Sequence, residues 1–306
     1  MHTLETASFA HLPATLRLGD LEVRRLGFGA MRLPGKDVWG EPTDPEQARA
    51  VLRRAVELGV NLIDTSWYYG PLVANRLIRE TLHPYPRDLV IACKLGGRRH
   101  PDKSWGPFIR PEELRQGCEE DLTSLGLDRL DVVHLRYMKT EVPFLESLDA
   151  LIALQREGKI RHLALSNVDA TQVELALART PLVAIQNLFN VDGGSGRLAR
   201  QSHAEVDHPV RVLSLCEKYG LAYLPFFPLA VGGLQKGHPA LEAAAERHGA
   251  SLAQVAIAWL LARSPVMLPI PGTSSLPHLE ENWTARTIEL SPEEVEAIGA
   301  PAARAE

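Results

Sequence analysis

The chain of 306 residues has a formal net charge of −5, 45% hydrophobic and 23% charged residues, and three widely separated cysteines. This is the composition of a globular protein, and the lack of a basic tract argues against nucleic acid as a partner. The cysteine spacing suits neither a zinc site nor a disulfide framework, so we expect no metal and a reducing compartment.

The first predicted element is a β-hairpin within residues 14–25. Two short extended runs, Thr15–Leu18 and Leu21–Arg24, flank Gly19-Asp20. A small turn that contains glycine between two such runs is typical of a hairpin.

From Leu26 onward, short apolar runs alternate with amphipathic segments. The predicted strands are Leu26–Met31, Asn61–Asp64, Leu89–Lys94, Asp131–His134, Arg161–Ser166, Val183–Gln186, Ala222–Phe226 and Met267–Pro271. The predicted helices are Pro45–Leu58, Val73–Leu82, Pro111–Leu125, Phe144–Glu157, Ala170–Arg179, Val210–Tyr219, Ser251–Arg263 and Leu276–Asn282. This alternation predicts an α/β fold, a closed (β/α)8 TIM barrel that occupies residues 1–306 as one domain. An extra helix, Pro292–Ile298, follows the barrel.

A doubly wound open sheet is the main alternative to the barrel. Such a fold normally has a G-x-G-x-x-G turn after its first strand. Here the first strand ends in Gly27-Phe28-Gly29-Ala30-Met31, without a third glycine or a helix start. We therefore favour the barrel, with the long loops Asn190–Pro209 and Pro228–Pro239 expected over its active face.

The N-terminus and the apolar segments indicate a cytoplasmic protein with no membrane partner. Residues 1–10 lack the basic start and apolar run of a signal peptide. The longest apolar stretch, near Ala253–Leu261, is too short to cross a bilayer.

Polar residues follow several predicted strands at the end where a barrel carries its catalytic groups. They are Asp64, with Tyr68-Tyr69-Gly70 behind it, Lys94, His134, Ser166-Asn167 and Gln186-Asn187. Each has an ordinary structural explanation when taken alone, such as capping or packing. Lys94 ends an apolar strand, however, and a buried lysine needs a charged partner, for which Asp64 is available.

Taken together, these residues form an acid–base group. A lysine cation lowers the pKa of a nearby phenol. Tyr69 can then give its proton to a carbonyl oxygen, while Asp64 holds Lys94 and His134 orients the substrate oxygen.

The sequence resembles the aldo-keto reductase superfamily over nearly the whole chain, and is closest to bacterial pyridoxal reductase-like members. The most specific signals are the segment that runs from Asp64 to Tyr69 and the segment 270–282 near the C-terminus. The matching segments are LGFGAM (26–31), NLIDTSWYYG (61–70), IACK (91–94), LDVVH (130–134), LSN (165–167), QN (186–187), FFPL (226–229) and IPGTSSLPHLEEN (270–282).

The resemblance implies a set of catalytic and cofactor-binding residues. The family's catalytic tetrad corresponds to Asp64, Tyr69, Lys94 and His134, with Tyr69 as general acid. The implied contacts to the nicotinamide are Ser166, Asn167, Gln186 and Phe226, and those to the adenosine part are Gly272, Thr273, Ser274, Ser275, His278, Glu281 and Asn282. Many members carry lysine or arginine in the phosphate loop and arginine in place of His278, and this sequence has neither, so the resemblance implies either NADP(H) or NAD(H) as cofactor. We expect modest selectivity for NADP.

Four functions remain open at this stage. The leading one is reduction of a small carbonyl substrate, an aldehyde or a ketone, to an alcohol by a monomer or small homo-oligomer. The same site could serve an NAD-dependent dehydrogenase that runs in the oxidative direction, or a non-catalytic sensor that binds the dinucleotide. A Schiff-base aldolase would need Lys94 neutral, which Asp64 opposes.

Overall fold

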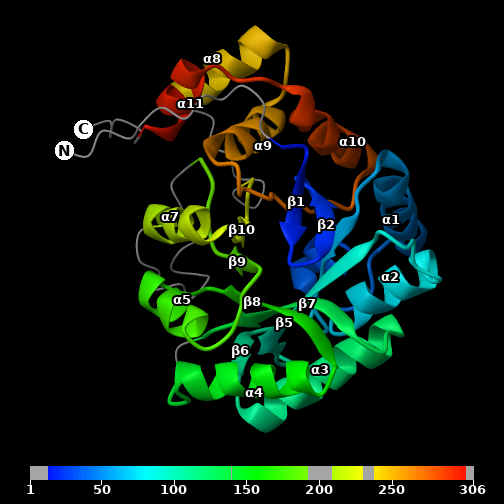
Figure 1. Ribbon diagram of the computed structural model, residues 1–306. Helices are drawn as coiled ribbons and strands as arrows, with labels where there is room; N and C mark the ends of the chain where they lie inside the picture. Colours follow the sequence, from blue (N-terminus) through cyan, green and yellow to red (C-terminus); the bar gives the residue numbers. More distant parts are fainter. Residues whose placement is uncertain (1–12, 139, 192–208, 230–237, 301–306) are drawn as a thin grey trace.

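The computed structural model describes residues 13–138, 140–191, 209–229 and 238–300, with strands inside a ring of helices (Figure 1). Parallel strands follow one another around the sheet in chain order. They are β3 (Phe28–Gly29), β4 (Leu62–Asp64), β5 (Val90–Arg99), β7 (Leu130–Arg136), β8 (Ile160–Ser166), β9 (Ala184–Gln186) and β10 (Ala222–Tyr223). The predicted α/β barrel is confirmed.

Residues 267–271 close the ring between β10 and β3. The backbone N–H of Leu268 donates to the Tyr223 carbonyl at 2.8 Å, and the N–H of Gly27 donates to the Pro269 carbonyl at 2.9 Å. This segment was predicted as the eighth strand, but it makes only an isolated bridge with Tyr223. The reason is that Pro269 and Pro271 have no N–H to donate to a regular ladder.

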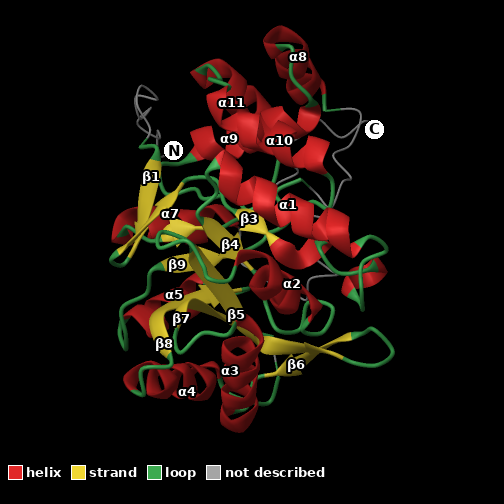
Figure 2. Cartoon of the chain, turned by 90° about the vertical axis from the view of Figure 1, so that its right-hand side faces the viewer, coloured by secondary structure: helices red, strands yellow, loops and turns green. Residues whose placement is uncertain are grey.

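Two strands differ most from their predicted bounds. β3 is shorter because Ala30–Arg32 forms a 3-10 turn. β5 continues five residues past Lys94, to Arg99, and its last four residues pair antiparallel with β6 (Trp105–Phe108), as Figure 2 shows. This hairpin was not predicted, because its glycines and arginines do not alternate in hydrophobicity.

The helices lie close to their predicted positions. They are α1 (Pro45–Leu58), α2 (Val73–Leu82), α3 (Pro111–Leu125), α4 (Phe144–Arg156), α5 (Ala170–Leu177), α7 (Pro209–Tyr219), α8 (Pro239–His248), α9 (Leu252–Arg263), α10 (Leu276–Thr284) and α11 (Pro292–Gly299). Local signals set many bounds: Asp44 accepts from the Gln47 N–H before α1, and Gly59 ends that helix at φ 100°. α8 was not predicted.

The loops predicted to cover the active face fall mostly outside the described residues. Of Asn190–Pro209 and Pro228–Pro239, residues 192–208 and 230–237 are not described. The predicted N-terminal hairpin is present as β1 (Thr15–Leu18) and β2 (Leu21–Arg24), which pair antiparallel.

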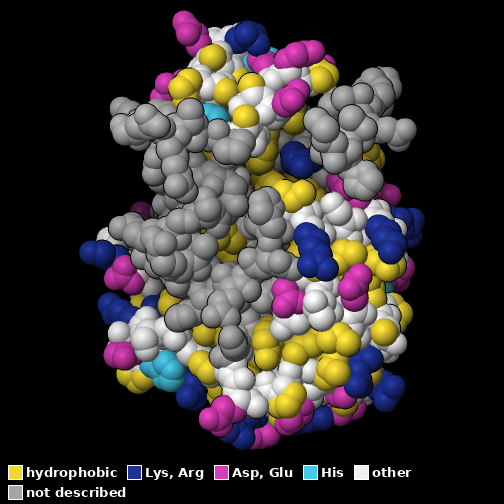
Figure 3. Space-filling view, turned by 90° about the vertical axis from the view of Figure 1, so that its left-hand side faces the viewer, with side chains coloured by type: hydrophobic (Ala, Val, Ile, Leu, Met, Phe, Trp, Pro, Cys, Tyr) yellow, Lys and Arg dark blue, Asp and Glu magenta, His cyan; other side chains and the backbone are white. Residues whose placement is uncertain are grey.

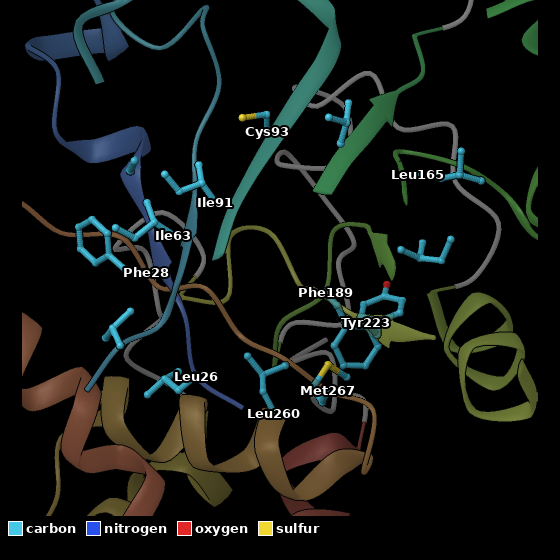
Figure 4. Packing of buried hydrophobic residues seen from close by; sticks show 14 of the residues in the cluster. Leu26, Phe28, Ile63, Ile91, Cys93, Leu165, Phe189, Tyr223, Leu260 and Met267 are labelled. Carbon is cyan, nitrogen blue, oxygen red and sulfur yellow. The ribbon is translucent and has the colours of Figure 1, made fainter. Parts of the chain in front are cut away.

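Two buried apolar clusters form the core. The larger lies between the strands and the helices, and Figure 4 shows Ile63, Ile91 and Cys93 from the strands together with Leu260 of α9. The smaller joins alternate strand residues with the hairpin, and includes Leu18, Val23, Leu62, Val90, Ala92, Val132, Ala164, Ala184 and Ala222. Since successive side chains of a strand point to opposite faces, this smaller cluster is the barrel interior.

The surface carries charges of both signs. On the face shown in Figure 3, Lys and Arg side chains are interspersed with Asp and Glu side chains where residues are described. Among the described residues, no helix is long and apolar enough to cross a membrane.

Candidate active site

Strand alternation brings the predicted polar residues to one end of the barrel interior. Each lies two residues after an interior position: Asp64 after Leu62, Lys94 after Ala92, and likewise His134, Ser166 and Gln186 after Val132, Ala164 and Ala184. All five side chains are buried. The strands thus carry an apolar layer inside the barrel and a polar layer at their carboxyl ends.

A buried ion pair lies at the centre of this polar layer. Lys94 Nζ donates to Asp64 Oδ1, and also to the Thr65 carbonyl at 3.2 Å. Gln186 Nε2 donates to Asp64 Oδ2 at 2.8 Å, so both carboxylate oxygens accept a hydrogen bond. The predicted pairing of Lys94 with Asp64 is present, and Gln186, predicted to contact the nicotinamide, also bonds to this pair.

Tyr69 lies on the loop after β4, beside this pair. Lys94 Nζ is 5.0 Å from the centroid of the Tyr69 ring, and the Tyr69 N–H donates to the Ser66 carbonyl at 3.0 Å. Burial raises the pKa of Tyr69 well above its ordinary value, and the charge of Asp64 raises it further. The expectation that Lys94 brings this pKa below its ordinary value is therefore wrong, because burial and Asp64 outweigh any such effect. The phenol keeps its proton at neutral pH, which is the form that a general acid needs.

His134 contacts the site through one ring nitrogen. Its Nδ1 lies 3.3 Å from the Cys93 carbonyl oxygen, and its Nε2 is buried without a hydrogen-bond partner among the described residues. Burial lowers the pKa of His134 to about 4, so the ring is neutral at physiological pH. Because a carbonyl only accepts, the Cys93 contact favours the proton on Nδ1 and leaves a lone pair on Nε2. Donation from Nε2 to a substrate oxygen, as expected from sequence, requires the other tautomer.

A cavity of about 570 Å3 opens beside Asp64 and Tyr69. Its lining also includes many of the predicted cofactor residues: Gln186, Phe226, Gly272, Thr273, Ser274, His278, Glu281 and Asn282. Gly29 forms part of the wall, where an added Cβ would lie 2.6 Å from the Ile270 carbonyl oxygen. Glycine at this position therefore lets β3 pack backbone against backbone with residues 270–272.

Three predicted cofactor residues do not line this cavity. Ser275 caps α10, where its side chain accepts from the His278 N–H at 3.5 Å. Ser166 and Asn167 lie at the end of β8, and Asn167 Nδ2 donates to the Tyr137 carbonyl at 2.9 Å. The buried Asn167 Oδ1 has no partner among the described residues.

The cavity also has lining residues that sequence analysis missed. They are Met31, Arg32, Phe227, Pro228, Leu229, Ser251, Leu252 and Ala253. Met31 ends the matched segment 26–31 and Arg32 follows it, so their position just after the first strand could have indicated them. The first turn of α9 offered none, because that helix is remote in sequence. Within the described part of the chain, no group of three His, Cys, Asp or Glu side chains could hold a metal.

Comparison with known proteins decides the family. A model of the aldo/keto reductase family matches residues 25–301. The chain belongs to the aldo/keto reductase family. It is thus an oxidoreductase, and the aldolase alternative also conflicts with the engagement of Lys94 by Asp64.

Two curated relatives of this aldo-keto reductase are close in sequence. Pyridoxine 4-dehydrogenase of Escherichia coli is 44% identical over 285 residues, which cover 91% of this chain and 95% of the relative. An uncharacterised oxidoreductase of Schizosaccharomyces pombe is 41% identical over 279 residues, which cover 91% of this chain and 87% of the relative. Among solved structures, an aldo/keto reductase of Klebsiella pneumoniae in complex with NADP and acetate has a TM-score of 0.74 and 25% identity, with 95% of this chain and 96% of that chain covered.

Proposed function

We propose that this aldo-keto reductase reduces aldehydes or ketones to alcohols with NADPH or NADH, and that Tyr69 is the proton donor. The observation that carries the proposal is the buried pair of Lys94 and Asp64 beside the Tyr69 ring, at the wall of the 570 Å3 cavity. An ion pair on the surface would carry no such argument. Burying two charges costs free energy of desolvation, so a buried pair beside a cavity points to a functional role.

The residues around the cavity fit a nicotinamide dinucleotide. Phe226 offers an aromatic face to the cavity, and Glu281 and Asn282 line it and are the residues we propose for the adenosine part. Gln186 reaches the cavity but its amide is bonded to Asp64, so its carbonyl oxygen is the atom left for a carboxamide. A bound reduced nicotinamide supplies a hydride to the carbonyl carbon.

Side chains of this protein supply the proton that the reduction requires. Tyr69 donates its phenolic proton to the substrate oxygen as that oxygen becomes an alkoxide. The ammonium of Lys94 stabilises the resulting phenolate, and Asp64 and Gln186 hold Lys94 in place. In the Nδ1–H tautomer His134 accepts from the hydroxyl of the alcohol, and in the other tautomer it donates to the carbonyl. By microscopic reversibility the same residues serve alcohol oxidation.

We further propose pyridoxal as the first substrate to test. The support is the 44% identity to a pyridoxine 4-dehydrogenase, which also makes oxidation of the alcohol a possible working direction. For the cofactor, Ser274, His278 and Arg32 line the cavity, but the phosphate loop has no lysine or arginine. We therefore propose modest selectivity for NADP, with NAD usable.

The test is a steady-state assay with pyridoxal and a panel of aldehydes, each with NADPH and NADH. We expect turnover with both cofactors. Tight cofactor binding without turnover of any carbonyl or alcohol would instead support the sensor alternative. A preference for NADPH of several hundredfold, at neutral and at mildly acidic pH, would contradict modest selectivity. Analytical ultracentrifugation of the same sample decides between a monomer and a small homo-oligomer.

A further inference from the structure

Arg136 is a cation at the end of the strand that carries His134. It is the last residue of β7, and Val132, His134 and Arg136 share one face of that strand because side chains alternate. On the neighbouring strands, His134 is in register with Lys94 and Arg136 with Ser166. Arg136 therefore lies one side-chain layer beyond the catalytic residues, about 7 Å along the strand from His134.

Two glycines of β5 make room for Arg136. An added Cβ at Gly97 would lie 3.0 Å from Arg136 Nη1 and 3.5 Å from the ring of Tyr68. Gly96 has φ 108° and backs onto the Arg136 carbonyl, where a Cβ would collide with backbone. Neither position can therefore carry a side chain without moving Arg136 or the strand.

The guanidinium is held in place by weak contacts. Its carbon lies 5.6 Å from the centroid of the Trp105 ring, and Nη1 donates to the Met138 sulfur at 3.0 Å. A thioether is a weak acceptor, so most of the five donors of the guanidinium are unused. Among the described residues no carboxylate forms an ion pair with it, although it is half-buried.

Arg136 differs in this respect from its neighbour Arg99. The Arg99 guanidinium stacks 4.3 Å from the Trp105 centroid and donates to the carbonyls of Asp37 and Lys103 at 2.8 and 2.7 Å. Arg99 thus ties the β5–β6 hairpin to the loop before α1. Arg136 donates to no backbone carbonyl within the described chain, so tying segments of the fold together does not account for its guanidinium.

Arg136 also lies near the proton donor and outside the cofactor cavity. The rings of Tyr69 and Tyr68 meet edge to face with centroids 5.4 Å apart, and Tyr68 meets Trp105 at 5.8 Å. The charge of Arg136 acts to lower the pKa of Tyr69 against the effect of burial. The residues that line the 570 Å3 cavity include Tyr69 but not Arg136.

We propose that Arg136 binds an anionic oxygen on the substrate, so that the enzyme prefers aldehydes that carry a phenolate, carboxylate or phosphate near the carbonyl group. A held guanidinium with unused donors forms charge-assisted, often bidentate bonds to such oxyanions. This inference rests on the proposed reductase function and names its substrate class.

The experiment compares matched pairs of aldehydes. The pairs are 3-formylbenzoate with its methyl ester, and salicylaldehyde with 2-methoxybenzaldehyde at a pH where the phenol is ionised. For the native enzyme we expect kcat/KM to favour the anion of at least one pair. Arg136→Met should reduce that anion-to-neutral ratio by about 10- to 100-fold, the range that a hydrogen bond to a charged group is worth. The pair that responds identifies the carboxylate or the phenolate as the preferred anion.

Control variants separate recognition from packing. Arg136→Lys keeps the charge and should retain part of the preference. Arg179→Met removes an exposed arginine that pairs with Asp149, and should leave the ratio unchanged. Unchanged ratios for both pairs in Arg136→Met would overturn the inference while leaving the reductase function intact.

Binding of a product analogue gives a readout that does not depend on turnover. If the native enzyme reduced none of the aldehydes, the proposed function would fail, and calorimetry with 3-(hydroxymethyl)benzoate would still test Arg136. Weaker binding to Arg136→Met than to the native protein supports the anion site, and equal binding overturns it. The dissociation constant for NADPH should be similar in both proteins, because Arg136 lies outside the cofactor cavity.

Discussion

Lys94 and Asp64 form an ion pair across two neighbouring strands of the barrel, with side chains that are each 4% exposed. Two charges at such depth are stable only together, since either one alone would be left without water or a counter-ion. A substitution of either residue is therefore expected to lower both the stability of the barrel and the proposed activity.

Replacement of Tyr69 by phenylalanine removes the proposed proton donor and keeps the ring. We expect turnover to fall by roughly 10²- to 10⁴-fold, which is the usual contribution of positioned acid catalysis. The dissociation constant for NADPH should change little. Tyr219→Phe is the matched control, because Tyr219 is 45% exposed and is not among the residues that line the cavity. Near-native turnover in Tyr69→Phe would rule out this residue as the acid.

Replacement of Lys94 by methionine leaves the Asp64 carboxylate buried beside an apolar side chain. We expect a loss of about 3–5 kcal/mol in the free energy of unfolding, together with loss of turnover. Adding Asp64→Asn should restore much of the stability but not the activity. Lys159→Met, which breaks an exposed pair with Glu119, should cost about 0–1 kcal/mol. Urea denaturation of the native protein and the three variants measures this, and a stable, active Lys94→Met enzyme would contradict the proposed tetrad.

Replacement of His134 by alanine removes the ring nitrogen that we propose contacts the substrate oxygen. We expect kcat/KM to fall more for poorly activated aldehydes than for activated ones, because an activated carbonyl depends less on polarisation by the enzyme. A series of para-substituted benzaldehydes provides the measurement. His162→Ala is the control, since His162 pairs with Asp20 at the tip of the N-terminal hairpin. Equal losses across the series would argue against contact with the substrate oxygen.

Asp121 should make stability depend on pH. It is fully buried on α3, where Asn75 Nδ2 donates to its Oδ1 at 2.7 Å, and burial raises its pKa to about 8. Below about pH 4 both the folded and the unfolded chain hold this proton, so its contribution to stability is complete. As the pH rises toward 8, the unfolded chain releases the proton and the folded chain keeps it, so stability is lost.

Asp121→Asn tests this because asparagine cannot ionise. Relative to the native protein, the variant should gain stability between pH 5 and pH 8, as measured by urea denaturation at both values. Asp149→Asn, at an exposed position on α4, should show no such trend. A constant difference between Asp121→Asn and the native protein at the two pH values would show that Asp121 is ionised when folded.

Much of the architecture follows from local sequence. The bounds of α1, α2 and α3 match their predicted ranges, because caps, prolines and terminal glycines such as Asp44, Pro45 and Gly59 act within a few residues. The barrel follows from the alternation of strands and helices, and the end of β4 at Asp64 follows from it in turn, whereas β5 runs past Lys94 to Arg99. That residues 1–306 form one domain stays a prediction, and so do the catalytic roles.

The tertiary structure decided what depends on contacts between distant segments. Gln186 bonds to Asp64 across 122 positions of sequence, which no local pattern indicates. Whether the pKa of Tyr69 rises or falls depends on the balance of burial against nearby charges, and burial is the larger cause. Which ring nitrogen of His134 carries the proton, and how many donors of Arg136 find an acceptor, depend on the groups that lie opposite them in space. Sequence placed charged residues at the end of the barrel, but only folding determined their partners, because hydrogen bonds and desolvation act over a few ångströms of space rather than along the chain.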